Sequence, residues 1–553
     1  MNYKKLNAIL TGRFLWKNEL LTENLYYIER LGEMLKTSLG PTGNSKIIFN
    51  KQTGEYKLTK DGERILREVK TLHPVISILA DAGIAAKKEV GDGSLMTSIL
   101  AVELYKKAVN LMREGLHPHI IIEGYNKALH IALDTLRCES KPVKFNEKII
   151  FSLVKTSLAS KLDLRSSTYL AEIVTKLLAN RQEDIIRHKI RMLDTIIIKT
   201  RAGGSIEDSR LIHGVLLHKS GADLMMPKKI KNAKIAIIEN DLGFKRPDLS
   251  VNFMLKGDFN IKKFYDTRWE ILNDILNAIL KTGANVILCK GNISEELRRL
   301  FVLKNVLAIR NVSSTDLNIL KNATNAMPIT NVKNLTTSHL GECNSVNEVI
   351  ISALDRWTIF EGCANPSYCS ILLRGVSEKI LETINDAVQN SIKSVILAIN
   401  DLGYVPGGGA VEMRIACQIR NAAYKYDNKT QLAMLSYAEA VEDTIMTLGI
   451  NCGIDPTTMK SNLKSHHNKG EMVGIDQYSR KIVRPSDLDI LDATHVKIQC
   501  FKSATEAASS LIRIDFVHYK ERIKEEPKSV IPEPVKQVRE ATENYLKSQN
   551  IKK

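Results

Sequence analysis

The sequence predicts a multidomain protein in which an α/β domain interrupts a mostly helical body. The chain has 553 residues, too many for one ordinary hydrophobic core, so about two to four domains are expected. Apolar residues recur at intervals of three and four through the first quarter of the chain, as in amphipathic helices. Between about residues 211 and 365, short apolar runs alternate with helical segments, and helical patterning returns from Glu378. The expected fold class is therefore mixed, with α and α/β domains.

The first third of the chain is expected to be helical, with one hairpin and several sharp turns. Gly and Pro force residues 39–43 out of helical geometry, so the first helix must end there. A hairpin with strands at 46–49 and 56–58 leads into the turn at 59–62. Helices are expected at 18–38, 63–72, 74–88, 95–113, 119–136, 146–160 and 166–179.

The middle of the chain is expected to form a separate α/β domain. Its compact apolar runs are typical of buried strands, and helical segments lie between or after them. The expected strands are 234–239, 285–289 and 307–312, and the expected helices are 267–281, 295–303 and 315–325.

The last third returns to helical patterning, and a run of three glycines at 407–409 leads into a helix at 410–423. Because the first and last thirds are alike, we expect them to pack into one helical body around the inserted domain. Residues 520–553 are charged and contain three prolines, which predicts a mobile tail. A helix at 535–547 is the alternative for part of this tail.

Composition excludes several classes of protein. The chain is 44% apolar and 25% charged, as soluble globular proteins are, and it has no apolar run of about 18 residues that could span a membrane. Its eight cysteines are scattered, in neither a zinc nor a redox spacing, so we expect reduced thiols and a cytoplasmic location. Lysine and arginine exceed the acids by 79 to 62, a net charge of +17. Because this charge is spread along the chain, no specific nucleic-acid partner is expected.

The segment 89–98 has the chemistry of a phosphate site. Gly91 and Gly93 allow the backbone to approach a ligand closely, and the amides of the following helix favour a phosphate. Asp92 between them would repel a bare phosphate but could hold one through Mg²⁺. Taken alone, the segment could also be a loop that merely begins a helix.

Further motifs follow in a fixed order. They are Leu-Gly-Pro-Thr-Gly at 39–43, Lys-Asp-Gly at 60–62, Glu-Val-Gly-Asp-Gly at 89–93, Gly-Leu-His-Pro at 115–118, Ile-Glu-Gly at 122–124, Ser-Ile-Glu-Asp-Ser at 205–209, Gly-Cys at 362–363, Arg-Gly at 374–375, Pro-Gly-Gly-Gly-Ala-Val-Glu-Met at 406–413, Gly-Ile-Asp-Pro at 453–456, Gly-Ile-Asp at 474–476 and Ser-Ala-Thr-Glu-Ala-Ala at 503–508. Together they resemble the group II chaperonins, which comprise the archaeal thermosome and the eukaryotic cytosolic chaperonin CCT. Segments 157–161, 269–272 and 340–343 are most similar to the eta type of CCT subunit.

The resemblance implies a chaperonin fold of three nested domains. Its parts are an equatorial nucleotide-binding domain at 1–138 and 401–527, an intermediate domain at 139–210 and 366–400, an apical substrate-binding α/β domain at 211–365 with a helical lid protrusion at about 242–281, and a charged tail at 528–553. The built-in lid points away from the bacterial type, whose lid is a separate protein.

The resemblance also implies that ATP and Mg²⁺ are bound. Asp92 resembles the Mg²⁺ ligand, Asp61 an aspartate that faces the γ-phosphate and its attacking water, and Lys161 a lysine that senses the γ-phosphate. The implied nucleotide contacts are Leu39, Gly40, Pro41, Asp92, Gly93, Ser94, Gly408, Gly409 and Asp492. For Asp492 a purely structural role remains equally open.

Two departures from the family pattern concern ATP hydrolysis. The family follows its acidic turn with three threonines or nearly so, whereas this chain has Ser94, Leu95 and Met96, and two side-chain donors are lost. The family places its main catalytic aspartate sixteen residues after the arginine that corresponds to Arg374, and here that position is Asn390. Asparagine can orient a water but cannot accept its proton at neutral pH.

A substitute base is available one turn earlier on the same predicted helix, where Asp386 lies about 6 Å from Asn390 by helical rise. An error of one turn in matching this helix to the family is another explanation. Ser45 and Phe516 also replace acids of the family pattern. Because losing a general base typically slows a reaction by about 10²- to 10⁴-fold, we expect slow or absent hydrolysis.

Three functions of different classes follow from these observations. The first is a subunit of a double-ring group II chaperonin, which would bind ATP and enclose unfolded client proteins together with neighbouring subunits. The second is a non-hydrolysing, chaperonin-like assembly or scaffold protein. The third, a basic nucleic-acid-binding protein, rests only on the net charge.

The helix expected at 295–303 is the candidate for client contact. Ser294 suits its N-cap, and Leu297, Leu300 and Phe301 form an apolar stripe. Arg298 and Arg299 add a polar edge to this stripe. The alternative is that this stripe belongs to the core of the α/β domain.

Overall fold

The computed structural model describes residues 13–519, except 16, 50–53, 55, 71–72, 145, 182–183, 186–192, 244–260, 353–354, 488 and 516. The predicted tail at 528–553, the alternative helix at 535–547, Phe516 and much of the predicted lid lie outside the described residues. Among the described residues, those before 25 and after 513 form a small unit, in which β1 (Arg13–Leu15) pairs antiparallel with β17 (Val517–Tyr519). Residues 25–513 form the main unit.

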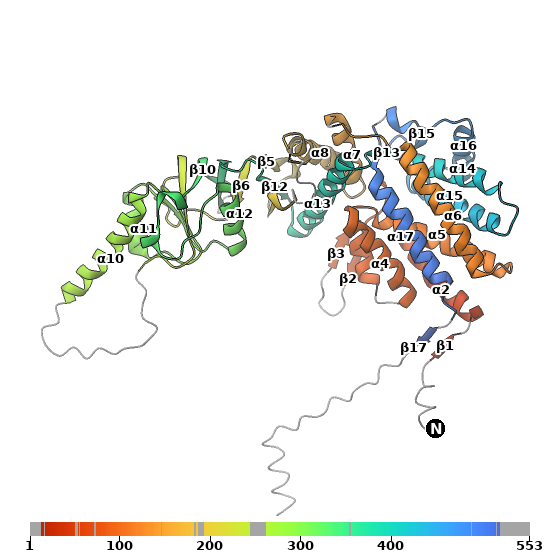
Figure 1. Ribbon diagram of the computed structural model, residues 1–553, viewed down its shortest axis with the longest axis horizontal. Coiled ribbons are helices and arrows are strands. Elements are labelled where there is room, and N and C mark those ends of the chain that lie inside the picture. Colours follow the sequence, from red (N-terminus) through yellow and green to blue (C-terminus); the bar gives the residue numbers. More distant parts are fainter. Residues whose placement is uncertain are drawn as a thin grey trace, which may run out of the picture. The chain divides into compact units, whose positions relative to one another are not determined.

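A helical body is built from both ends of the main unit (Figure 1). In it, α15 and α17 from the last third pack on α5 and α6 from the first third. Tyr125 and Tyr437 meet edge to face at 5.3 Å, and the Tyr437 hydroxyl lies 2.8 Å from Thr505 Oγ1. The helices are α2 (Lys17–Lys36), α3 (Gly62–Val69), α4 (Pro74–Val90), α5 (Ser94–Arg113), α6 (Pro118–Glu139), α14 (Ala410–Ala423), α15 (Thr430–Cys452), α16 (Pro456–Asn468) and α17 (Thr494–Ile512).

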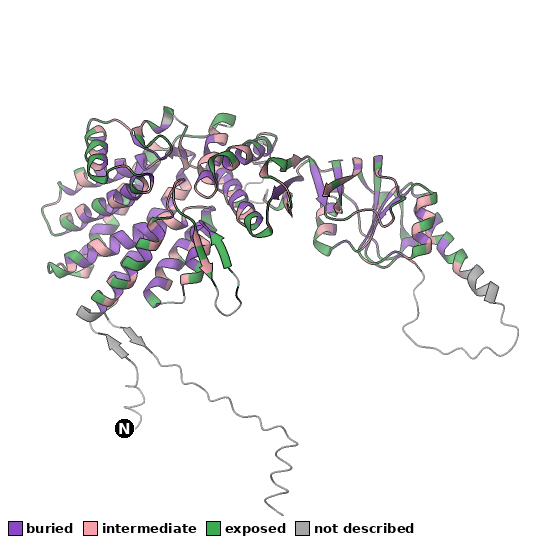
Figure 2. Ribbon diagram, turned by 180° about the vertical axis from the view of Figure 1, so that it is seen from behind, coloured by how far each residue is buried: buried purple, intermediate pink, exposed green. Residues whose placement is uncertain are grey.

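Buried and exposed faces follow the predicted helical periodicity, as Figure 2 shows for the helices of this body. On α4, Val75, Leu79 and Ala86 are buried. No helix among the described residues combines the length and the apolar content needed to cross a bilayer.

The α/β part contains a six-stranded sheet with the strand order β6-β11-β10-β7-β8-β9. The strands are β6 (Gly214–Leu217), β7 (Lys229–Ile238), β8 (Val286–Cys289), β9 (Leu307–Ile309), β10 (Gly341–Ser352) and β11 (Asp355–Cys363). Strands β7, β8 and β9 are parallel, and the other pairings are antiparallel. The helices α10 (Ile261–Lys281), α11 (Glu295–Leu303) and α12 (Ser314–Thr324) contribute to its core.

A second part of the chain with both helices and strands has its own hydrophobic core. Its three-stranded sheet has the order β4-β12-β5, formed by β4 (Ile196–Ala202), β12 (Cys369–Gly375) and β5 (Arg210–Ile212). The helices α7 (Glu147–Ala159), α8 (Leu164–Ala179) and α13 (Glu378–Asn400) contribute to this core. Two cores with separate residues make the protein multidomain, as the sequence predicts.

The predicted elements agree with the structure to within a few residues for most helices, and α11 and α14 have the predicted limits. The compact apolar runs at 234–239, 285–289 and 307–312 predict β7, β8 and β9, although β7 begins five residues earlier and β9 ends three residues earlier than predicted. The sequence interpretation did not include β10 and β11, since polar residues such as Asn344, Asn347 and Glu348 interrupt the pattern of β10. Their pairing is set by neighbouring strands rather than by local sequence.

Phe501 on α17 provides a test of the helical body, because its ring is fully buried. Phe501→Ala should lower the free energy of unfolding by about 3–5 kcal/mol, the typical cost of a cavity of that size. The matched control is Tyr424→Ala, whose side chain is exposed, and urea unfolding followed by circular dichroism measures both. Equal stability of the two variants would contradict this packing.

Candidate functional site

The acidic turn, residues 91–93, connects α4 to α5 through two left-handed glycines. Gly91 has a φ of +88° and Gly93 a φ of +92°, a conformation that other residues rarely adopt. A Cβ on Gly91 would lie 2.7 Å from the carbonyl oxygen of Asn390, and one on Gly93 would overlap Cys500 Sγ. Close packing against α13 and α17 therefore requires glycine at both positions.

Two other glycine turns, here called the first turn (residues 39–43) and the third turn (residues 407–409), both contact the segment formed by β14 (Gly474–Asp476) and Gln477. In the third turn, residues 407–409, the carbonyl of Gly408 accepts a 2.8 Å hydrogen bond from the amide of Ile475. In the first turn, residues 39–43, Gly40 lies against the Gln477 side chain, and Gln477 Oε1 accepts a 3.3 Å hydrogen bond from the Thr42 amide. The first and third turns are thus joined through one short segment.

A buried lysine links the third turn to the acidic turn. Asp492, on β16 (Leu491–Ala493), lies against Gly407. Lys497 Nζ lies 2.8 Å from Asp492 Oδ2 and 2.5 Å from Glu412 Oε1, and Cys500 of the same helix packs against the acidic turn. Burial opposes the charge on Lys497, but the two carboxylates outweigh it and raise the lysine pKa.

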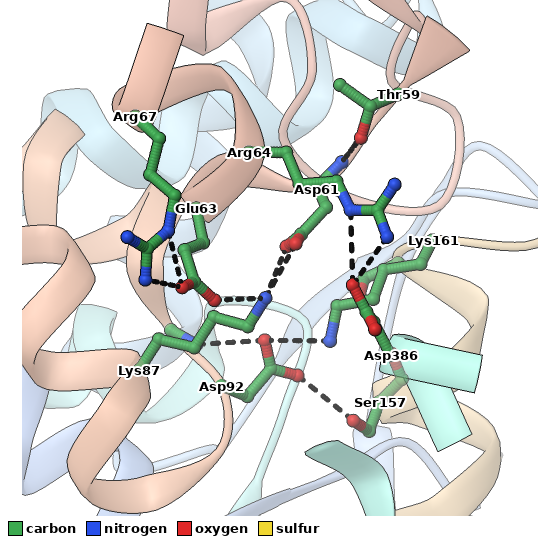
Figure 3. Close-up of polar contacts among 12 residues, drawn as sticks. Thr59, Asp61, Glu63, Arg64, Arg67, Lys87, Asp92, Ser157, Lys161 and Asp386 are labelled. Atoms are coloured by element: carbon green, nitrogen blue, oxygen red, sulfur yellow. Dashed lines mark hydrogen bonds and ion pairs between the residues drawn. The ribbon is translucent and has the colours of Figure 1, made fainter. Parts of the chain in front are cut away.

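Asp92 is held at the tip of the acidic turn by three groups (Figure 3). Its carboxylate accepts hydrogen bonds from the Gly93 amide at 2.9 Å and from Ser157 Oγ at 3.0 Å, and it pairs with Lys161 Nζ at 3.2 Å. Burial raises the pKa of Asp92, but Lys161, the Gly93 amide and the more distant Lys87 together lower it below its usual value. The carboxylate is therefore ionised at neutral pH and available to a cation.

Asp61 lies in a buried ion-pair cluster with Lys87 and Glu63 (Figure 3). Lys87 Nζ lies 2.8 and 2.6 Å from the two oxygens of Asp61 and 3.1 Å from Glu63 Oε2. Burial lowers the pKa of Lys87, but the pairing with Asp61 and Glu63 outweighs it, and the pKa is raised. The sequence interpretation did not include Lys87. A lysine on the buried face of α4, one turn before Gly91, was the signal that could have identified it.

The helix α13 packs against the acidic turn through its residue 390. Asn390 is half-buried, and its backbone carbonyl packs against Gly91. One turn earlier, Asp386 accepts hydrogen bonds from Arg64 at 2.6 and 3.1 Å, so this carboxylate already has a cationic partner (Figure 3).

Lys60 is a second residue that sequence reasoning missed. Its Nζ donates a 2.8 Å hydrogen bond to the Pro41 carbonyl of the first turn, and only 8% of the residue is exposed. Within the described part of the chain no carboxylate pairs with it, and burial lowers its pKa to about 8. A buried ammonium without a counter-ion favours an anionic ligand.

The remaining predicted site residues lie in the same three turns. Leu39 O accepts a 2.8 Å hydrogen bond from Asn451 Nδ2, and Gly409 has a φ of +81° at the start of α14. Ser94 is buried at the start of α5, where it and Leu95 pack against Gly62. Leu95 and Met96, the two positions that depart from the family pattern, are both half-buried. Their side chains therefore contribute to packing.

The candidate client helix, α11, is capped as predicted, with Ser294 Oγ accepting a 3.4 Å hydrogen bond from the Leu297 amide. Leu297 and Phe301 have no exposed surface and belong to the core of the six-stranded sheet domain. For these two residues the alternative interpretation therefore holds, namely that the stripe belongs to the core of the α/β domain. Leu300 and Arg298 are partly exposed, and Arg298 donates to the Ala222 carbonyl at 3.3 Å.

A mixed α and α/β fold with three joined glycine turns, one of them acidic, is consistent with a chaperonin. The chain belongs to the TCP-1/cpn60 chaperonin family, which residues 31–521 match. It is 33% identical to thermosome subunit beta of Saccharolobus shibatae over 500 residues, which cover 90% of each chain. The thermosome subunit of Methanocaldococcus jannaschii is 31% identical over 503 residues, which cover 90% of this chain and 92% of that protein. These relatives confirm the predicted group II membership, and the similarity to the eta type stays a prediction.

The Lys497 cluster provides a test of how the turns are joined. Lys497→Met would leave Glu412, which is 1% exposed, and Asp492 without their cation. Breaking a buried pair in this way should lower the free energy of unfolding by about 3–5 kcal/mol. Lys502→Met, on an exposed position of the same helix, is the control. Thermal unfolding distinguishes the two, and a harmless Lys497→Met would show that this lysine does not stabilise the site.

Proposed function

We propose that this chain is a subunit of a double-ring group II chaperonin that binds ATP with Mg²⁺ and assists the folding of unfolded proteins. We further propose that this subunit hydrolyses ATP slowly. The observation that carries the proposal is a set of three linked glycine turns, one of which carries an ionised Asp92 and packs against Asn390.

Nucleotide binding is supported by groups that an anion would satisfy. Lys60 is a buried cation with no carboxylate partner among the described residues, and Thr42 Oγ1 is buried there without a hydrogen-bond partner. Both lie at the first turn, whose Gly40, with a φ of +82°, allows a ligand to approach the backbone. The amides at the start of α5 add further donors for a phosphate.

Asp92 is the residue that would hold Mg²⁺. The described residues contain no cluster of three or more His, Cys, Asp or Glu side chains that could bind a metal alone. Mg²⁺ commonly uses one or two carboxylates together with substrate phosphates, so Asp92 fits a metal that arrives with the nucleotide. Lys161, which pairs with Asp92 at 3.2 Å, would move or share this carboxylate when the metal binds.

Slow hydrolysis is supported by the nature of two side chains on α13, an amide at position 390 and, one turn earlier, a carboxylate that already has a cationic partner. Asn390 cannot accept a proton from water at neutral pH. Asp386, the substitute considered from the sequence, accepts two hydrogen bonds from Arg64, so this carboxylate is already engaged by another side chain. Asp61 would face the γ-phosphate in this proposal, but it too is paired with a lysine.

The domain assignment is part of the proposal. Residues 1–138 and 401–527 would be equatorial, 139–210 and 366–400 intermediate, and 211–365 apical with the lid at about 242–281. The two α/β cores, one in the six-stranded sheet domain and one around α13, support a division between the apical and intermediate parts. All eight cysteines are free thiols, which supports a cytoplasmic location.

Client contact is proposed at α11 and the loop beside it. Arg298 and Leu300 would contribute their accessible surface, while Leu297 and Phe301 would support the helix from the core. Leu224 and Met225 in the adjoining loop and Leu303 at the end of α11 are 73–79% exposed. Exposed apolar side chains of this kind suit the apolar segments of unfolded chains.

Asp92→Asn tests the metal ligand. Removing the charge should weaken binding of Mg-ATP by at least about tenfold, because the metal loses its carboxylate. Binding of ATP in EDTA should not weaken, because the Asp92 carboxylate repels the bare phosphates. Asp81→Asn, at an exposed position of α4, is the control. Calorimetry with and without Mg²⁺ measures both, and equal losses in the two conditions would argue against a metal ligand.

Asn390→Asp tests the missing base. It should raise the single-turnover hydrolysis rate by about 10²-fold or more, within the usual contribution of a general base. Gln389→Glu, which adds the same charge at an exposed neighbour, should leave the rate unchanged. Wild-type turnover already equal to that of a thermosome subunit would refute slow hydrolysis.

The alternative of a chaperonin-like scaffold makes a different prediction about assembly. Purification of the chain from its native source should yield a ring with paralogous or identical subunits at ring stoichiometry, seen by native mass spectrometry. A monomer bound to unrelated proteins would favour the scaffold instead.

A further inference from the structure

Lys87 is the most completely paired cation in the candidate site. Its ammonium group has three hydrogens, and three carboxylate oxygens lie within 3.1 Å of Nζ, two from Asp61 and one from Glu63. The side chains of Lys87 and Asp61 are only 2% and 5% exposed. Lys87 thus has no hydrogen left for a ligand.

The pairing uses both oxygens of Asp61. The Asp61 amide is also fixed, since it donates a 3.0 Å hydrogen bond to Thr59 Oγ1, and Gly62 packs against the start of α5. Asp61 is therefore held in position from its backbone and its side chain. Because both oxygens of this carboxylate already accept hydrogen bonds from Lys87, fewer of its lone pairs remain free to bind a water molecule.

The same cluster contributes a cation to the site, because Lys87 is held in place by Asp61 and Glu63. Asp61, Glu63 and Asp92 would carry three negative charges. Lys87, Lys161 and Arg67, which pairs with Glu63, balance all three. The Lys161–Asp92 pair and the Lys87–Asp61 pair differ in the exposure of the carboxylate, since Asp92 is partly exposed and Asp61 is buried. A ligand metal can therefore compete for Asp92 but not easily for Asp61.

We propose that Lys87 is a positioning residue that keeps hydrolysis slow by holding the Asp61 carboxylate, an inference that rests on the proposed nucleotide site. In hydrolysis a water oxygen bonds to the γ-phosphorus, the bond to the bridging oxygen breaks, and a water proton passes to an acceptor. Lys87 withdraws Asp61 from the acceptor or water-orienting role. Asn390 and Lys87 then restrict the same step independently.

The test uses the full-length chain in the assembly in which it purifies. Lys87→Gln and Lys87→Arg are compared with Lys88→Gln, which removes the same charge from the exposed neighbour on α4. Each is made in the wild-type and the Asn390→Asp backgrounds. Affinity for Mg-ATP is measured by calorimetry, and hydrolysis of bound ATP by single turnover.

In the Asn390→Asp background, Lys87→Gln should raise the single-turnover rate by about tenfold or more, with affinity changed by less than about threefold. Lys87→Arg, which keeps the cation, should remain slow, and Lys88→Gln should have no effect. Adding Asp61→Asn to Lys87→Gln should abolish the gain, because Lys87 acts through Asp61.

The inference is overturned if Lys87→Gln binds nucleotide normally but is no faster in either background, or if Lys87→Arg is as fast as Lys87→Gln. Because Lys87→Gln could fold poorly, a nucleotide-bound structure of the wild-type protein provides a second measurement. The Lys87–Asp61 pair should remain closed in it, and a separated pair would also overturn the inference. Failure of wild-type protein to bind Mg-ATP would instead refute the proposed function.

Discussion

The acidic turn is the constraint on which the rest of the candidate site depends. Two left-handed glycines allow α4 to end and α5 to begin within three residues, and both pack so closely that a Cβ would collide with α13 or α17. Between them, Asp92 lies at the tip of the turn, where Ser157 of α7 and Lys161 just after that helix contact its carboxylate. One short turn thus connects helices from the beginning, the middle and the end of the chain.

Electrostatics then decides what this geometry can do. Asp92 is paired yet partly exposed, which suits a carboxylate that exchanges a lysine for a metal ion. Asp61 is paired and buried, which suits a carboxylate that is held in place. At α13 the available groups are an amide at 390 and an acid already bound by Arg64. The site therefore has groups for binding an anion with its metal but few for taking a proton from water.

Much of this could be predicted from the sequence, because the information was local. Gly91, Gly93 and Gly408 occur in turns that only glycine permits, and helices such as α11 and α14 follow from periodicity and capping. Leu297 and Phe301 show the limit of such reasoning, since an apolar stripe looks the same whether it faces a core or a client. Lys60 and Lys87 were missed because the importance of a lysine depends on its partners, which come from distant parts of the chain.

This site is proposed to bind Mg-ATP and to turn it over slowly. Single-turnover measurement of phosphate release from ATP bound to the wild-type protein, beside a thermosome subunit under the same conditions, tests it most directly. We predict that phosphate release is slower by about 10²-fold or more, while Mg-ATP still binds. Release at the rate of the thermosome subunit would contradict it.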